Sequence, residues 1–207
     1  MRIKVCGVTT IEDAEGCSAL GVDLLGLNFV PSSPRRVSIE GARRIAERVR
    51  GKVEIVGVTA DLEVAEIREL ALSVGLDLVQ LHGDEPPELV MKLGGLAFKA
   101  LRMGDAADVA EASRYAGLIL VDAKAPGQLG GTGKVVDFSL VAPLARSRPL
   151  LLAGGLTPAN VAAAIEAVGP FGVDVASGVE KAPGVKDLDL VGRFVSEARK
   201  ATRARRA

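Results

Sequence analysis

The stretch VEIVGVTADLEVAEIRELALSVGLDLVQL, residues 53–81, holds two apolar runs on either side of a segment with helical spacing. The runs at 53–58 and 76–81 are almost continuously apolar and rich in Val, Ile and Leu, which is typical of strands buried on both faces. Between them, residues 62–74 place apolar side chains three and four positions apart, as an amphipathic helix does. The stretch therefore predicts two parallel strands joined by a helical crossover.

The same unit recurs along all 207 residues. The predicted strands are 3–6, 23–29, 53–58, 76–81, 97–101, 118–122, 149–154 and 171–177, and the predicted helices are 11–20, 39–49, 62–74, 86–93, 106–115, 138–145, 158–168 and 188–200. Thr157 before Pro158 predicts the start of the seventh helix. Eight such units predict an α/β protein of the (β/α)8 TIM-barrel class, and an open doubly wound sheet is the alternative. Because no Pro-, Gly- or Ser-rich linker divides the chain, we expect one catalytic domain over residues 1–207.

Composition narrows the classes of partner. Lysine plus arginine and aspartate plus glutamate both number 26, which gives no reason to expect nucleic acid or an anionic membrane as partner. No apolar stretch approaches the roughly 18 residues of a membrane span, and the N-terminus lacks the apolar region of a signal peptide. Two cysteines make no disulfide framework, so we expect a reduced, cytoplasmic protein. With His82 as its single histidine, the chain has no multi-histidine metal site.

A barrel places its active site at the carboxyl ends of the strands. Glycine-rich turns follow the seventh and eighth predicted strands, as AGGLTPAN (153–160) and ASGVE (176–180). Backbone N–H groups of Gly154, Gly155, Ala176 and Ser177 would converge on a phosphate there, because glycine lets the backbone approach an anion closely. A tight strand-to-helix turn without a ligand is the alternative for the first turn, and the presence of both turns favours phosphate.

Cys6 and Asp122 end the first and sixth predicted strands, on opposite sides of the expected barrel mouth. A thiolate and a carboxylic acid that face each other there would move protons on a substrate held between them. Taken alone, Cys6 is also compatible with a buried filler, which we favour for Cys17, and Asp122 with a cap on a loop N–H.

Two loops remain. Arg35 or Arg36, after the second strand, would clamp a carboxylate through a bidentate fork or pair with a helix carboxylate at the surface. The segment QLGGTG, residues 128–133, lacks the spacing of a nucleotide-binding loop. We interpret it as a lid with glycine hinges, within the loop 123–134.

Six segments together resemble the phosphoribosylanthranilate isomerase family of tryptophan biosynthesis. They are KVCGVT, FVPSSPRRVS, VQLHGDE, LVDAKAPGQLGGTGKVVDFS, LAGGLTPANV and GVDVASGVE, they occur in the family's order, and they span essentially the whole chain. The resemblance implies a (β/α)8 barrel that converts N-(5-phosphoribosyl)anthranilate into 1-(2-carboxyphenylamino)-1-deoxyribulose 5-phosphate by an Amadori rearrangement. It implies no metal or organic cofactor and a small-molecule substrate as partner. The oligomeric state stays open, with a homodimer as one option.

The resemblance also assigns roles to residues. Cys6 would be the general base and Asp122 the general acid. Arg35, which matches the family's arginine better than Arg36 does, would hold the anthranilate carboxylate. His82 and Asp174 match positions that the family places around the substrate.

The chain departs from the family's pattern at four positions without losing a proposed catalytic group. Thr59 and Asp61 stand where the family has Phe and Asn, a change that would alter packing of the anthranilate ring. Phe138 replaces a tryptophan and Ala176 a serine. The remaining alternatives are another phosphosugar barrel, such as a thiamine-phosphate synthase or a pentose-phosphate epimerase, and a barrel that binds a phosphorylated ligand without turnover.

Overall fold

Eight parallel strands close into a barrel in the order of the chain, with β1 paired to both β2 and β8. This computed structural model describes residues 1–123 and 138–205, so the expected lid at 128–133 lies outside the described residues. The strands are β1 (Arg2–Cys6), β2 (Leu24–Asn28), β3 (Glu54–Thr59), β4 (Leu78–Leu81), β5 (Ala97–Met103), β6 (Ile119–Ala123), β7 (Leu150–Ala153) and β8 (Gly172–Val175). The predicted TIM barrel is therefore confirmed, and the open sheet is excluded.

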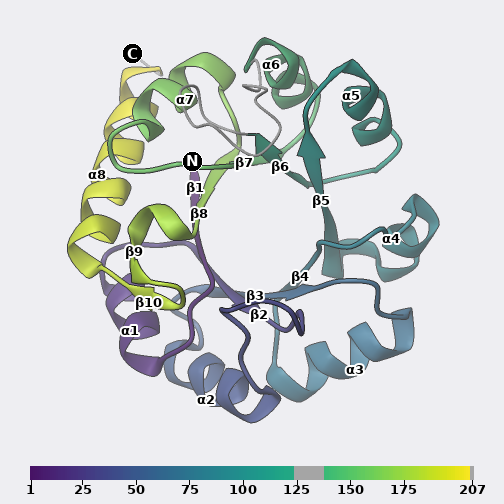
Figure 1. Ribbon diagram of the computed structural model, residues 1–207, viewed down its shortest axis with the longest axis vertical. Helices are drawn as coiled ribbons and strands as arrows, with labels where there is room; N and C mark the ends of the chain where they lie inside the picture. Colours follow the sequence, from purple (N-terminus) through teal and green to yellow (C-terminus); the bar gives the residue numbers. More distant parts are fainter. Residues whose placement is uncertain (124–137, 206–207) are drawn as a thin grey trace.

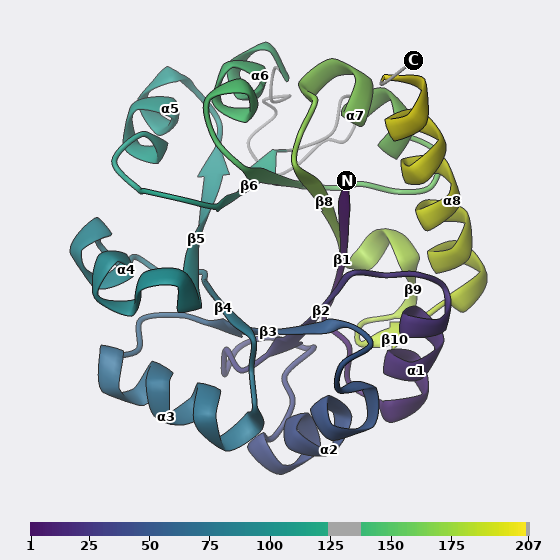
Figure 2. The ribbon, with the colours of Figure 1, turned by 180° about the vertical axis from the view of Figure 1, so that it is seen from behind.

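Helices surround the barrel as an outer ring, which Figures 1 and 2 show from its two sides. They are α1 (Ile11–Ala19), α2 (Ile39–Val49), α3 (Val64–Val74), α4 (Pro87–Leu93), α5 (Ala106–Ala112), α6 (Phe138–Ser147), α7 (Val161–Val168) and α8 (Leu188–Ala204). Within the described residues, no helix is both long and apolar enough to cross a membrane.

The predicted start of the seventh helix at Thr157 is wrong. Helix α7 begins at Val161 with Asn160 at its N-cap position. The Asn160 side chain accepts from the Thr157 N–H at 2.7 Å and donates to the Gly155 carbonyl at 3.0 Å, so it ties the turn after β7 together. Asn160 therefore stabilises the turn before α7, and Thr157 lies inside this turn and does not cap the helix.

The strands separate two apolar regions. Most buried apolar side chains lie between the barrel and the helices, whereas a smaller cluster of Leu24, Val56, Phe98, Leu120, Leu151 and neighbouring alanines fills the barrel itself. Among the inward-facing residues of β1, Lys4 is fully buried and pairs with Asp174 of β8. The interior of the barrel therefore holds a buried ion pair in addition to its apolar cluster.

A hairpin that the sequence pattern did not predict follows β8. A short 3-10 helix, η2 (Ser177–Val179), leads into this hairpin of β9 (Glu180–Ala182) and β10 (Val185–Lys186). The hairpin lies beside α1 and next to the end of β1 in Figure 1. It therefore carries Glu180 and Lys186 to the loops that follow β1 and β2.

Candidate active site

A cavity of about 470 Å³ opens at the carboxyl ends of the strands, where the barrel fold is expected to hold its active site. All nine candidate residues line it, although they come from six strand ends and the loops after them. These residues are Cys6, Arg35, His82, Asp122, Gly154, Gly155, Asp174, Ala176 and Ser177. The structure thus brings the candidates together, and their individual roles remain predictions.

A second hollow, of about 590 Å³, lies at the opposite end of the barrel. Its walls include the ion pairs Arg2–Glu54 and Arg199–Asp23, and none of the nine candidates reaches it. The amino-terminal face of such barrels serves stability rather than catalysis. We therefore place the chemistry at the smaller cavity.

Cys6 is the last residue of β1 and faces this cavity. It is not the buried filler that the sequence left open, because the residue is partly exposed and lines the cavity. Gly26 on the adjacent strand makes room for the thiol, since a Cβ atom there would come within 2.7 Å of the Cys6 sulfur. Cys17, in contrast, is fully buried in α1, and burial raises its pKa to about 12.

A buried ion pair lies directly beneath Cys6. The Lys4 ammonium is 2.8 Å from Asp174 Oδ1, and the two residues are neighbours in the β1–β8 register. Burial alone would lower the pKa of Lys4, but the negative charge of Asp174 and its hydrogen bond raise it, so Lys4 stays charged. Sequence reasoning missed Lys4 because a lysine inside a short strand gives no sign that its side chain points into a barrel.

Burial raises the pKa of Cys6 above its ordinary value of 9.0, and the Lys4 charge opposes that rise. The thiol is then protonated at neutral pH, so we expect alkylation of Cys6 by iodoacetamide to accelerate with pH up to and beyond 9. Mass spectrometry of the labelled peptide at pH 6 to 10, with Cys6→Ser as control, measures this. A rate already constant from pH 7 upward would mean a preformed thiolate and would contradict the expectation.

Asp122 lies near the end of β6 and is half-buried on the wall of the same cavity. In the closed barrel, β7 and β8 separate β6 from β1, so Asp122 and Cys6 stand three strand positions apart around the ring rather than diametrically opposite. His82, from the end of β4, also faces this space, and Gln80 Nε2 contacts its Nδ1 at 2.9 Å. Burial lowers the pKa of His82 below 6.5, so its ring is neutral at pH 7.

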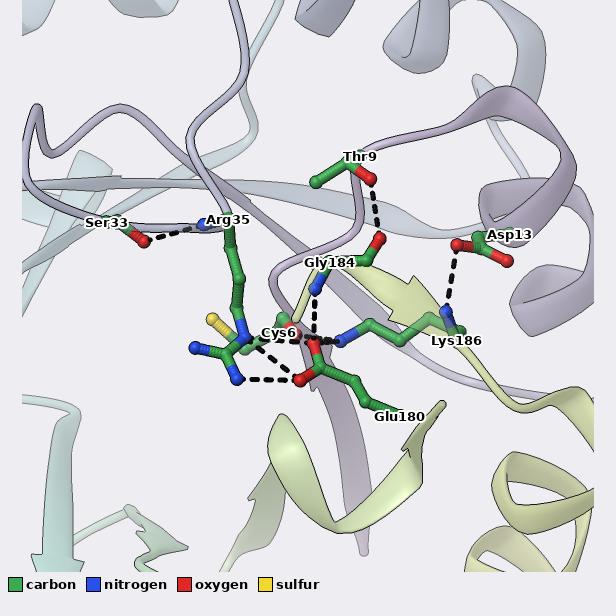
Figure 3. A network of polar contacts seen from close by, with 8 residues as sticks. All are labelled: Cys6, Thr9, Asp13, Ser33, Arg35, Glu180, Gly184 and Lys186. Carbon is green, nitrogen blue, oxygen red and sulfur yellow. Dashed lines mark hydrogen bonds and ion pairs between the residues drawn. The ribbon is translucent and has the colours of Figure 1, made fainter. Parts of the chain in front are cut away.

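Arg35 rather than Arg36 lines the cavity. Its side chain already holds a carboxylate of the chain itself: Arg35 Nε and Nη2 donate to Glu180 at 2.9 Å and 2.6 Å (Figure 3). The guanidinium thus binds a protein carboxylate, which lies in the hairpin strand β9 and not in a surface helix, and it still borders the cavity. Glu180 lies 145 residues away in the chain, which is why no sequence pattern revealed the pair.

The two glycine-rich turns meet at the rim of the cavity. Gly155 has φ +63°, a conformation that favours glycine, and a Cβ atom on Gly178 would collide with the Leu156 carbonyl oxygen. The turn after β7 therefore packs directly on the start of η2, where Ser177 lies. Gly178, which was not among the candidates, is what permits this contact.

Replacing Gly178 by alanine should push the two turns apart. We expect KM for a phosphorylated substrate to rise roughly tenfold or more, because misplaced donors lose the anion, while kcat changes less. Gly95→Ala is the matched control, since nothing lies within 4 Å of its added Cβ and it is remote from the cavity. Equal KM values for the two variants would show that the contact of the turns does not shape the site.

The departures at Thr59 and Asp61 do not reach the cavity. The residues of this segment that line it are Val58 and Ala60, whereas Thr59 is buried away from it. Asp61 has φ +57° and accepts from the Asp84 N–H at 2.7 Å, so it joins the loops after β3 and β4. The expected change in packing of a bound ring by these two side chains is therefore not supported by their positions.

Comparison with known proteins gives a consistent result. The family model described as N-(5'phosphoribosyl)anthranilate (PRA) isomerase matches residues 3–197. The N-(5'-phosphoribosyl)anthranilate isomerase of Myxococcus xanthus is 47% identical over 205 residues, covering 96% of each chain. A crystal structure of phosphoribosyl anthranilate isomerase from Thermotoga maritima matches this chain with a TM-score of 0.88 at 42% identity. The match covers 97% of this chain and 99% of that one.

Two further solved structures are informative. One is a phosphoribosyl anthranilate isomerase in complex with reduced 1-(o-carboxyphenylamino)-1-deoxyribulose 5-phosphate, with a TM-score of 0.86 at 39% identity. The other concerns monomers generated from the dimeric enzyme of Thermotoga maritima, with a TM-score of 0.84 at 38% identity. Each covers 97% of this chain and 99% of its own.

Proposed function

The chain belongs to the N-(5'-phosphoribosyl)anthranilate isomerase family of tryptophan biosynthesis, and we propose that Cys6 and Asp122 perform its acid–base chemistry. The substrate is N-(5-phosphoribosyl)anthranilate, and the product is 1-(2-carboxyphenylamino)-1-deoxyribulose 5-phosphate. The observation that carries this assignment is a single cavity lined by a thiol, a carboxyl group, an arginine and two glycine-rich turns.

The two ends of the substrate are anionic, and the cavity offers a partner for each. The turns at Gly154–Gly155 and Ala176–Ser177 present backbone N–H groups to the phosphate. Arg35 receives the anthranilate carboxylate with the edge of its guanidinium that Glu180 leaves open. Anchoring both ends holds the ribose between Cys6 and Asp122, which lowers the entropic cost of reaction.

The first step is ring opening. Asp122, in its protonated form, donates a proton to the ribose ring oxygen as the C1–O bond breaks, and the anthranilate nitrogen supplies the electron pair that forms an iminium. The neutral ring of His82 and the carboxylate of Asp174 border the same space and contact the sugar hydroxyl groups.

The second step removes the C2 proton, which the adjacent iminium has acidified. Cys6 takes this proton as a thiolate and leaves an enolamine, which tautomerises to the ketone with return of the protons, so that the reaction is a net isomerisation. Burial raises the pKa of Cys6. The thiolate therefore depends on positive charge, from Lys4 below it and from the substrate iminium above it.

Turnover of generated phosphoribosylanthranilate by the purified protein tests the proposal. We expect its fluorescence to disappear faster than the spontaneous breakdown, in proportion to enzyme concentration. Tight binding of the reduced product analogue without any turnover would instead indicate a barrel that only binds the ligand.

We extend the proposal to association as a homodimer. Its support is the relative from Thermotoga maritima that is described as dimeric. Light scattering on the purified chain should give twice the mass of 21.4 kDa, and a monomer mass at all concentrations would refute the extension.

A further inference from the structure

Glu180 collects an unusual number of donors for a single carboxylate. It accepts from Arg35 Nε and Nη2, from Lys186 Nζ at 2.7 Å and from the Gly184 N–H at 3.2 Å (Figure 3). Its side chain is only 4% exposed. Burial by itself would raise the pKa of Glu180, but the hydrogen bonds from Arg35 and Lys186 lower it to about 2. The carboxylate is therefore ionised throughout the working range of pH.

Lys186 extends this network to β1, the strand that ends at Cys6. Its ammonium is fully buried and bridges Glu180 Oε1 and the Cys6 carbonyl oxygen, the latter at 2.6 Å. Its backbone N–H donates to Asp13 at 3.1 Å. Glu180 and Lys186 thus connect the end of β1, which carries Cys6, with the loop after β2, which carries Arg35.

The Arg35 side chain is fixed along its whole length. Its aliphatic part passes so close to Gly7 that a Cβ atom on that residue would collide with Arg35 Cδ. At its tip, Glu180 occupies the side of the guanidinium formed by Nε and Nη2, and within the described residues no hydrogen bond engages Nη1. A guanidinium has five donors, so the edge formed by Nη1 and the second Nη2 proton is available to another carboxylate.

We propose that Glu180 is a positioning residue, which orients Arg35 so that its outer edge meets the anthranilate carboxylate and thereby selects a substrate that carries this group. The inference rests on the proposed function, since it needs an anthranilate bound next to Arg35. Lys186 donates both to the same carboxylate and to the Cys6 carbonyl oxygen, so it fixes the position of Glu180 relative to the end of β1. The cluster of Arg35, Lys186 and Glu180 retains one net positive charge for the incoming carboxylate.

Positioning and simple charge make opposite predictions for one variant. Glu180→Gln removes a negative charge beside Arg35, so by charge alone it would tighten binding of an anionic ligand. If Glu180 acts by orientation, the same change frees the guanidinium to rotate and weakens binding of the carboxylate. The sign of the effect therefore separates the two explanations.

The experiment uses two ligands and isothermal titration calorimetry. One ligand is the reduced product analogue, reduced 1-(o-carboxyphenylamino)-1-deoxyribulose 5-phosphate, and the other is the same molecule without the carboxylate. For Glu180→Gln we expect the Kd of the first to rise roughly tenfold and that of the second to stay within about twofold. Arg35→Met should lose the same discrimination, and Arg35→Met combined with Glu180→Gln should be no worse than Arg35→Met alone.

The other possible results of the calorimetry contradict either the inference about Glu180 or the proposed function. Equal weakening of both ligands would mean a structural role, and tighter binding of the carboxylated ligand would mean that charge alone matters. Unchanged binding of the carboxylated ligand would mean that Glu180 does not act on recognition of this group. Any of these three results overturns the inference. Glu180→Asp keeps the charge but shortens the side chain, so it should also lose discrimination, and it serves if Glu180→Gln does not fold. Wild-type protein that binds neither ligand would refute the proposed function itself.

Discussion

Replacement of Cys6 by alanine should lower kcat by about 10²- to 10⁴-fold, the range expected for loss of a general base. The reason is that Cys6 faces the cavity at the end of β1, above the Lys4–Asp174 pair. Binding of the reduced product analogue should change only a few-fold, because the phosphate turns and Arg35 are untouched. Steady-state assays and calorimetry on one preparation measure both quantities.

Cys17→Ala is the matched control for this loss. It also removes a thiol, but from the fully buried interface of α1, so its effect should be on stability and not on kcat. A Cys6→Ala enzyme with near-normal turnover would show that another group removes the C2 proton.

Asp122→Asn should produce a second loss of about 10²- to 10⁴-fold in kcat, because the amide fills the same volume but has no acidic proton to give. Substrate deuterated at C2 separates the two roles. In Asp122→Asn, ring opening becomes limiting and the isotope effect on kcat should fall toward one, whereas in Cys6→Ala proton removal stays limiting and the effect should persist.

Asp84→Asn is the control for charge at this rim. Asp84 is exposed in the loop after β4, so its neutralisation should leave kcat unchanged. If Asp122→Asn behaved like Asp84→Asn, the acid would have to be sought elsewhere on the cavity wall.

The repeating units of the fold were readable from sequence because each has its own local signal. Strands buried on both faces appear as continuous apolar runs, and the helices between them have amphipathic spacing. Closure of the barrel then makes one rim collect every strand end, which is why Cys6, His82 and Asp122 could be expected near each other. The hairpin β9–β10 was missed because its strands of three and two residues are too short for any periodicity.

The supporting contacts of the site depend on three-dimensional neighbours that no local pattern encodes. Lys4 lies between the apolar residues Ile3 and Val5 in a short strand, and only closure onto β8 shows that it meets Asp174. In the sequence, Glu180 is simply the last residue of the ASGVE turn. Its pairing with Arg35 arises only when the hairpin folds back over the end of β1. Sequence reasoning therefore identified residues that face the substrate better than those that hold them in place.

The most direct test of the central claim is a crystal structure of this protein with reduced 1-(o-carboxyphenylamino)-1-deoxyribulose 5-phosphate. We predict that the phosphate accepts hydrogen bonds from the backbone N–H groups of Gly155 and Ser177. The sugar chain should then run between Asp122 and Cys6, with the sulfur about 3.5 Å from C2. A sulfur turned away from C2, or a phosphate bound at a different part of the rim, would contradict the account.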